Sequence, residues 1–358
     1  MTAQPLRLVL LGDGDSPHLL KWARALAAVP GLELWALSSR GFMADFDACP
    51  PPARRLALGT APDHAGGNAQ LLLQLPRVAR WLKQVDAHWL HAHYLTSHGT
   101  LAWLAQRFFG VRGQMVASAW GSDILVTPLH SAVLRWATSK VLRASALSTS
   151  DSQVMAERMR ELGAAEVMVF PFGLEAMPQA SLTKDDTLFF ANRGLEPIYR
   201  PERVLRQFAA LAGDTGRLVV ANDGSLRAAL ERQAASMGLA RRVQFVGRLN
   251  TSEQSEWYAK SRWYLSLPQS DSVAVSVLEA MAHGCVPILS DLPANRELVR
   301  DGDNGLVVPE GRLLEPGALD GLRLRADAVA AANRDWVQDN ALFPPCVEAF
   351  IGRLRQLS

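Results

Sequence analysis

The sequence predicts an α/β protein with two Rossmann-like, doubly wound domains. Short apolar runs alternate with segments of helical period in the first half of the chain, which is typical of a parallel sheet covered by helices. The same alternation begins again in the second half. The chain has 358 residues, enough for two domains that each bury a core, and 49% of them are hydrophobic, as in globular proteins.

The first half of the chain contains six apolar runs of strand length, separated by segments of helical period. This order is typical of a parallel doubly wound sheet. The predicted strands are Arg7–Leu11, Leu32–Leu37, His88–Ala92, Gln114–Ala117, Ala146–Ser148 and Val167–Phe170, and the predicted helices include His18–Ala28, Thr100–Phe109, His130–Leu142 and Gln153–Leu162.

The second half repeats the pattern after Leu174–Asp186, where prolines, polar residues and charges interrupt the periodicity. Its predicted strands are Leu188–Ala191, Arg217–Ala221, Val243–Val246, Trp263–Leu267, Val286–Leu289 and Gly305–Val308. We therefore expect an N-terminal domain over residues 1–178, a second domain over 179–335, and a helical tail over 336–358 that is broken at Pro344 and Pro345.

Composition excludes several classes of protein. The formal net charge of +2 argues against a dedicated nucleic-acid binder. Apolar runs stay well below the ~18 residues of a membrane span, and the first one, Leu8–Leu11, is too short for a signal peptide. The three cysteines, Cys49, Cys285 and Cys346, lack metal-ligand spacing, so we expect a cytoplasmic protein with reduced thiols.

The segment Ser270–Glu297 contains two acids with seven residues between them, Asp271 and Glu279. Asp271 and Ser272 are good N-cap residues and Gly284 is a good C′ residue, which predicts a helix from Ser272 to His283. The backbone N–H groups of its first turn would suit a diphosphate, and Glu279 lies two turns further on, where it would accept ribose hydroxyls. Spacing alone also fits an ordinary amphipathic helix with solvated acids.

The order of residues around this helix resembles the donor-site signature of the retaining family 4 glycosyltransferases (glycosyl transferases group 1), which have the GT-B fold. Its elements are Asp271, Glu279, Ala280–Ala282, Gly284, Val286–Ser290, Glu297–Val299 and Asn304–Val308. The resemblance implies two Rossmann-like domains that face each other across a cleft, with the ligand at the carboxyl ends of the strands. It also implies that the last helix packs back on the N-terminal, acceptor-binding domain, and that the second domain binds the nucleotide sugar.

The resemblance assigns donor-binding roles to several residues of the second domain. Asp271, where glutamate is commoner in the family, would hold sugar hydroxyls, and Arg193 would contact the diphosphate. Ile198 stands where the family often has a lysine, so Arg200 or Arg248 would neutralise the second phosphate. The donor-binding candidates of this domain are Arg193, Arg248, Asp271, Ser272, Val273, Ala274, Val275 and Glu279.

The loop Leu11–His18 resembles the family loop that closes over the donor phosphates and the acceptor, which makes Gly14 a donor-binding candidate. Two other interpretations are weaker. The first is a dinucleotide site, which Gly12 and Gly14 suggest, but Pro17 stands where the third glycine of that fingerprint would be. The second is a metal site, because Asp13 and Asp15 resemble the metal-binding acid pair of the other large glycosyltransferase fold. We interpret both acids as turn-forming residues, so we expect no metal and no cofactor.

Two aromatic positions of the first domain complete the candidate site. His93 follows His91 at the end of a predicted strand and would hydrogen-bond the sugar or acceptor. Trp120, in the phrase Ser118–Asp123, stands where many family members have a histidine that touches the transferred sugar. Because tryptophan accepts no hydrogen bond, its sugar contact would be stacking or indole N–H donation.

The resemblance implies a metal-independent, retaining glycosyltransferase, with Asp271, Arg193 and His93 as catalytic candidates. The acceptor would be a carbohydrate or a lipid-linked molecule of bacterial polysaccharide, lipopolysaccharide or glycolipid synthesis. Two alternatives remain open: a GT-B-like nucleotide-binding protein without transfer, because of Trp120, Ile198 and Asp271, and a nicotinamide-dependent oxidoreductase.

Two segments have apolar residues beside basic ones, Leu71–Val85 and Leu134–Arg143. We interpret both as core-facing helices with a solvated basic side. The alternative is a peripheral contact with a lipid surface, at the inner face of the membrane.

Overall fold

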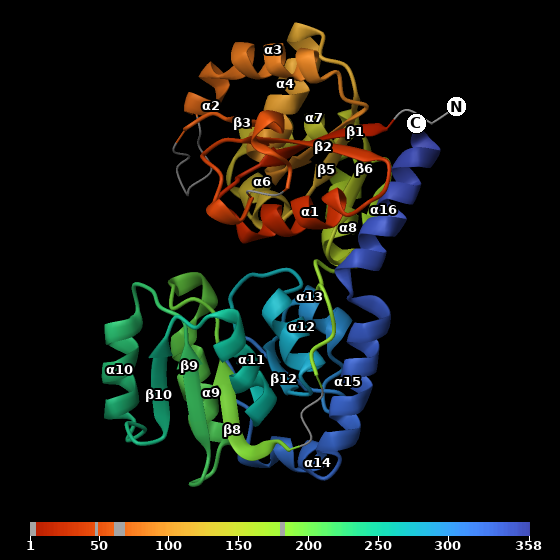
Figure 1. Ribbon diagram of the computed structural model, residues 1–358. Coiled ribbons are helices and arrows are strands. Elements are labelled where there is room, and N and C mark those ends of the chain that lie inside the picture. Colours follow the sequence, from red (N-terminus) through yellow and green to blue (C-terminus); the bar gives the residue numbers. More distant parts are fainter. Residues whose placement is uncertain (1–4, 47–48, 61–68, 180–182) are drawn as a thin grey trace. The chain divides into compact units, whose positions relative to one another are not determined.

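The computed structural model describes residues 5–46, 49–60, 69–179 and 183–358 (Figure 1). The chain forms two compact units. Unit 1 consists of Met1–Phe170 together with Phe343–Ser358, and unit 2 of Pro171–Leu342. Both units are built on a wholly parallel sheet, as the alternation of apolar runs and helical segments predicts.

The sheet of unit 1 has seven strands in the order β3-β2-β1-β4-β5-β6-β7. The order reverses beside β1, which makes the sheet doubly wound. All six strands predicted for this half are present, and β3 was not predicted because it is a short edge strand with a single large apolar residue. The strands are β1 (Leu6–Gly12), β2 (Leu32–Ser38), β3 (Arg55–Ala57), β4 (Trp89–His93), β5 (Gln114–Ser118), β6 (Ser145–Ser150) and β7 (Val167–Val169).

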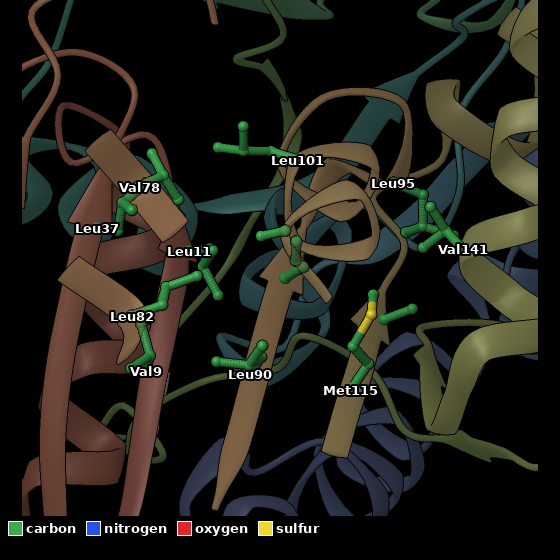
Figure 2. Packing of buried hydrophobic residues seen from close by; sticks show 14 of the residues in the cluster. Val9, Leu11, Leu37, Val78, Leu82, Leu90, Leu95, Leu101, Met115 and Val141 are labelled. Carbon is green, nitrogen blue, oxygen red and sulfur yellow. The ribbon is translucent and has the colours of Figure 1, made fainter. Parts of the chain in front are cut away.

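The helices of unit 1 lie on two faces of this sheet. One face packs on α3, α4, α7 and α8, and Figure 2 shows Val78 and Leu82 of α3 pointing towards Val9 and Leu11 of β1. On the other face, α1 packs against α16. The helices are α1 (Pro17–Ala27), α2 (Ala69–Leu73), α3 (Leu75–Val85), α4 (Thr100–Phe109), α5 (Ser122–Leu125), α6 (Thr127–His130), α7 (Ala132–Ala144), α8 (Gln153–Leu162) and α16 (Phe343–Leu357), with shorter turns η1 (Ala44–Phe46), η2 (Pro52–Arg54) and η3 (Tyr94–Gly99).

The sheet of unit 2 has six strands in the order β10-β9-β8-β11-β12-β13, and all six were predicted. They are β8 (Asp185–Ala191), β9 (Arg217–Ala221), β10 (Val243–Gly247), β11 (Ser261–Ser266), β12 (Val286–Ser290) and β13 (Leu306–Val308). The helices are α9 (Pro201–Leu211), α10 (Arg227–Ser236), α11 (Thr251–Lys260), α12 (Val275–Ala282), α13 (Pro293–Leu298), α14 (Asp320–Arg323) and α15 (Ala326–Asn340), with turns η4 (Pro197–Tyr199) and η5 (Pro316–Leu319).

The C-terminal tail differs from the prediction. The helix break falls at Ala341–Leu342, and Pro344 and Pro345 lie in the first turn of α16. A proline is tolerated there because the first N–H groups of a helix have no partner within the helix. The whole of α15 belongs to unit 2, whereas α16 belongs to unit 1.

The units divide at residues 170/171 and 342/343, compared with the 178/179 and 335/336 placed from the sequence. The segment after Phe170 packs on unit 2, since the Leu174 N–H donates to the Ala341 carbonyl at 2.8 Å. Among the described residues, we find no helix with the length and apolar character needed to cross a membrane.

Candidate functional site

The predicted donor-binding residues of unit 2, apart from Arg248, lie on segments that follow the carboxyl ends of two neighbouring strands. β8 ends at Ala191 and is followed by Asn192 and Arg193, while β11 ends at Ser266 and leads through a loop to α12. The carboxyl ends of parallel strands meet at one edge of a sheet, where ligands of doubly wound folds bind. The topology therefore brings Arg193 to the loop that carries Asp271.

Arg193 and Asp271 form a close ion pair. Nη2 of Arg193 donates to Oδ2 of Asp271 at 2.6 Å, and Nη1 donates to the Ser276 hydroxyl of α12 at 3.3 Å. The guanidinium also lies over the Tyr199 ring, 4.5 Å from its centre. The side chains of Arg193 and Asp271 keep 18% and 22% of their surface exposed, so both remain within reach of a ligand.

Burial raises the pKa of the Asp271 carboxyl above its ordinary value, while the charge of Arg193 and the N–H of Ser272 oppose that shift. Oδ1 of Asp271 accepts the Ser272 N–H at 3.1 Å. The ion pair thus fixes a cation and a carboxylate side by side, with the guanidinium in a position to pair with phosphate oxygens.

A chain of buried hydrogen bonds holds Glu279. The Tyr264 hydroxyl donates to Oδ1 of Asn192 at 2.7 Å, and Nδ2 of Asn192 donates to the Tyr258 hydroxyl at 2.7 Å. Tyr258 in turn donates to Oε2 of Glu279 at 3.1 Å. Burial raises the pKa of both tyrosines, so they stay protonated. This network orients the Glu279 carboxylate, which is half-buried.

The start of α12 corrects the sequence prediction. The helix begins at Val275 with Ala274 at the N-cap, so Asp271 and Ser272 are not its caps. The reason is tertiary: Val273 and Ala274 bury their side chains in a core cluster of unit 2, which keeps the preceding loop out of the helix. Only their backbone groups would face a ligand, beside the first N–H groups of α12.

The second-phosphate candidates come from two connecting segments: Arg200 lies between η4 and α9, and Arg248 directly follows β10. Arg200 pairs with Glu310, and Arg248 is an exposed residue after β10. Ile198 is exposed as well. Sequence reasoning missed Asn192, Tyr199, Tyr258, Tyr264 and Ser276, which support the ion pair and Glu279; only the position of Asn192 directly before Arg193 gave a signal.

In unit 1 the structure brings Trp120 and His93 together. The indole Nε1 of Trp120 donates to Nδ1 of His93 at 3.0 Å. Since Nδ1 is the acceptor, neutral His93 carries its proton on Nε2, an atom that has no hydrogen-bond partner among the described residues. The sequence suggested that the indole N–H of Trp120 could be donated to the sugar. In this structure that N–H is donated within the protein instead.

Asp123 holds the loop that carries Trp120. Its buried carboxylate accepts the Trp120 N–H at 2.9 Å and the Leu95 N–H at 3.1 Å, which ties the loop after β5 to the turn after β4. Tyr94, in that turn, has a positive φ of 60° and stacks on Trp120 at 6.0 Å. A positive φ in a bulky residue is uncommon and costs energy, so the surrounding contacts must hold it.

Gly14 is required by packing within unit 1. Its N–H donates to the Ser38 hydroxyl at 2.8 Å, and a Cβ here would lie 2.5 Å from the Gly41 carbonyl. The neighbouring acids have protein partners, Ser39 for Asp13 and Arg40 for Asp15. Among the described residues, His, Cys, Asp and Glu side chains form no group of three or more arranged to hold a metal ion.

Two protein-family models match the chain. The model described as "Glycosyl transferases group 1" matches residues 174–315, and "Glycosyl transferase 4-like" matches residues 7–152. The N-acetyl-alpha-D-glucosaminyl L-malate synthase of Bacillus anthracis is 22% identical over 235 residues, which are 62% of this chain and 61% of the relative.

Solved structures share the whole fold. Anabaena HepE in complex with UDP superposes with a TM-score of 0.79 at 14% identity, over 99% of this chain and 100% of that one. The complex of the same protein with UDP-glucose gives a TM-score of 0.76 at 14% identity, with the same coverage. Sucrose-phosphate synthase from Thermosynechococcus elongatus gives 0.74 at 16% identity, over 98% and 99%.

Proposed function

We propose that the chain transfers a sugar from a nucleoside diphosphate to an acceptor hydroxyl with retention at the anomeric carbon. The chain belongs to the group 1 glycosyltransferases, with a family 4-like N-terminal unit and the GT-B fold. The observation that carries this proposal is the Arg193–Asp271 pair at the carboxyl edge of the unit 2 sheet, beside the start of α12 and the supported Glu279.

The proposed donor is a uridine diphosphate sugar. UDP and UDP-glucose complexes of the similar HepE support this choice. Glu279 would accept the ribose hydroxyls, and the Tyr258 hydroxyl would keep its carboxylate in place. Arg193 and the first N–H groups of α12 would bind the diphosphate, where negative charge grows as the sugar leaves.

The proposed reaction needs no protein nucleophile and no metal. The bond between the anomeric carbon and the diphosphate oxygen breaks while the acceptor oxygen attacks the same face of the sugar. The leaving diphosphate takes the acceptor proton, so atoms and charge balance. Asp271 would hold sugar hydroxyls near the oxocarbenium-like centre, and the Arg193 guanidinium would stabilise the leaving group.

We propose that the acceptor is a carbohydrate or lipid-linked molecule, used at the cytoplasmic face of a bacterial membrane in polysaccharide, lipopolysaccharide or glycolipid synthesis. The second candidate is a nucleotide-binding protein without transfer. Trp120 favours it, because its indole N–H is already donated to His93. Family membership argues against the nicotinamide-dependent oxidoreductase.

The test combines thermal shift with donor consumption over a panel of uridine, guanosine and adenosine diphosphate sugars, with NAD and NADP as further ligands. We expect stabilisation by UDP and consumption of one UDP-sugar. Stabilisation by UDP without consumption, in the presence of lipid and carbohydrate acceptors, would favour the binding protein. A response to nicotinamide cofactors alone would overturn the proposal.

Two variants then locate the site. Glu279→Gln should weaken UDP binding by about ten- to a hundredfold, because a charge-assisted hydrogen bond is worth ~1.5–3 kcal/mol. Asp271→Asn should lower kcat/KM by about a hundredfold. The matched control is Asp185→Asn, which breaks the Arg217–Asp185 ion pair at the amino end of the same sheet and should leave both values unchanged. Unaltered donor use in both site variants would contradict the assignment.

A further inference from the structure

Three large apolar side chains project from consecutive helices on the outer surface of unit 1. Leu129 of α6 is 64% exposed, and Val133 and Trp136 of α7 are 73% and 55% exposed. Val133 and Trp136 are three residues apart and therefore lie on one helix face. The Trp136 ring meets Trp103 of α4 edge to face at 5.8 Å, which supports it in its exposed position.

The helix that carries Val133 and Trp136 also carries three cations. Nζ of Lys140, one turn beyond Trp136, lies 5.7 Å from the centre of its ring. Arg135 and Arg143 are exposed on the same helix. The sequence of α6 and α7 contains no aspartate or glutamate. We call Leu129, Val133 and Trp136, with Arg135, Lys140 and Arg143, the α6–α7 surface.

The positive charge extends over the neighbouring helices of the same face. Residues 69–144 contain eight lysines and arginines but only two acids, Asp86 and Asp123, and Asp123 is buried. This stretch therefore has a net charge of +6, whereas the whole chain has +2. The small total hides a strongly asymmetric distribution, concentrated on the side of unit 1 that α3, α4 and α7 cover.

The other segment singled out in the sequence lies differently. Leu71, Val78 and Leu82 are buried in the core, so the apolar side of α3 packs on the sheet and its basic side remains outside. On α7, Val141 and Leu142 are likewise buried, but Trp136 and Val133 are not. α7 and the adjoining α6 thus combine exposed apolar groups with cations, and Leu72 and Leu73 of α2 and Phe108 of α4 are exposed as well.

We propose that the α6–α7 surface docks on a bilayer of anionic phospholipids. Tryptophan is favoured at the membrane interface, where its ring is apolar and its N–H remains hydrated. Lysine and arginine beside it are attracted to acidic headgroups, and the absence of acids from α6 and α7 removes the opposing repulsion. The proposal goes beyond the proposed function, because this binding requires neither donor nor acceptor.

The test is co-sedimentation of the full chain with vesicles of phosphatidylcholine alone or mixed with phosphatidylglycerol. We expect binding to the anionic vesicles, little binding to the neutral ones, and loss of binding in 0.5 M salt. The double variant Val133→Ser/Trp136→Ser should bind at least tenfold more weakly. The triple variant Arg135→Gln/Lys140→Gln/Arg143→Gln should bind about a hundredfold more weakly, at about fivefold for each charge.

Matched controls come from unit 2. Leu324→Ser changes an apolar residue that is 92% exposed, and Arg232→Gln/Arg241→Gln/Arg312→Gln removes three exposed cations. Both controls should bind vesicles like the unaltered chain. Circular dichroism and the UDP thermal shift, measured on every variant, report the fold and the donor site independently of lipid.

Several results would overturn the proposal: equal binding to both kinds of vesicle, no binding, or α6–α7 variants that bind like the controls. Self-association of the chain that the α6–α7 variants abolish would identify a protein interface instead. A missing UDP shift together with normal vesicle binding would contradict the proposed function and leave the lipid surface supported.

Discussion

Trp120 acts on His93 through the hydrogen bond from its indole Nε1 to Nδ1 of His93. A protonated histidine donates from both nitrogens, so it would face the indole N–H with a second donor. The contact therefore favours neutral His93. Burial, followed by repulsion from His91, His98 and His18, also lowers the pKa of His93 well below its ordinary value. His93 is thereby suited to hydrogen bonding as a neutral group.

The variant Trp120→Phe keeps an aromatic ring and removes the donor. We expect the Nδ1 nitrogen of His93 to lose its accepted hydrogen bond, seen as a shifted ¹⁵N resonance and a mixed tautomer population. The unsatisfied buried acceptor should cost about 1–3 kcal/mol of unfolding free energy.

The control is Trp35→Phe, which removes a partly exposed indole bond to Glu33 and should leave the His93 resonances unchanged. An unchanged His93 spectrum in Trp120→Phe would show that this hydrogen bond does not set the tautomer.

Some of the side chains chosen from the sequence lie together in the structure, and their donor-binding roles stay predictions. Arg193 and Asp271 were both chosen as donor-site candidates, and the structure brings them within 2.6 Å. Tyr199 and Tyr258 were not chosen, because no local pattern shows that the Tyr199 ring lies against the Arg193 guanidinium or that Tyr258 of α11 reaches Glu279. Their roles as proposed supports follow from tertiary contacts alone.

At the scale of the element, β4 shows how one strand divides its side chains. Leu90 and Ala92 join the apolar core under α3 and α4. His91 and His93 point to the opposite face, as successive residues of a strand do. There Trp22 of α1 meets the His91 ring at 4.8 Å, and Phe350 of α16 meets it at 5.1 Å. The strand therefore buries two imidazoles among aromatic rings.

This burial makes the stability of unit 1 depend on pH. Burial lowers the pKa of His91 to about 3, so between pH 6.5 and pH 3 the unfolded chain binds a proton that the folded chain does not. Stability should therefore fall as the pH drops below 6.5. For His91 alone the loss at pH 5 is about 2 kcal/mol.

Urea unfolding at pH 7.5 and pH 5.0 measures this loss. His91→Gln removes the titrating group but keeps a hydrogen-bonding side chain near Ser118, so the difference between the two pH values should shrink by about 2 kcal/mol. His130→Gln, at an exposed position of α6, should leave the difference unchanged. The same pH dependence in both variants would contradict the assignment to His91.

At the scale of the whole molecule, the chain passes between the two units twice, and the two connecting segments pair with each other within unit 2. Leu174 and Leu342 form a parallel bridge, and the Leu174 N–H donates to the Ala341 carbonyl. Gly173 permits this approach, because a Cβ there would lie 1.7 Å from the Ala341 oxygen. That atom belongs to the backbone and cannot turn aside as a side chain would.

Gly173→Ala should therefore separate the paired segments and lower the unfolding free energy of unit 2 by about 1–3 kcal/mol. Urea unfolding monitored by UDP binding would measure this change. Gly352→Ala, in α16, meets no atom within 4 Å and should instead stabilise unit 1 by about 0.5–1 kcal/mol, because alanine favours a helix. Equal stability of Gly173→Ala and the unaltered chain would show that the segments can separate without cost.

The sequence by itself determined the fold class, twelve of the thirteen strands that the structure describes, the family and the choice of the central donor-site candidates. These follow from local periodicity and from residues that are close together along the chain. Only the tertiary structure decided where α12 begins, which side chains support Arg193 and Glu279, and that the Trp120 indole is bonded to His93. These features depend on packing between segments far apart in sequence, because burial and hydrogen-bond partners are set by neighbours that no local pattern specifies.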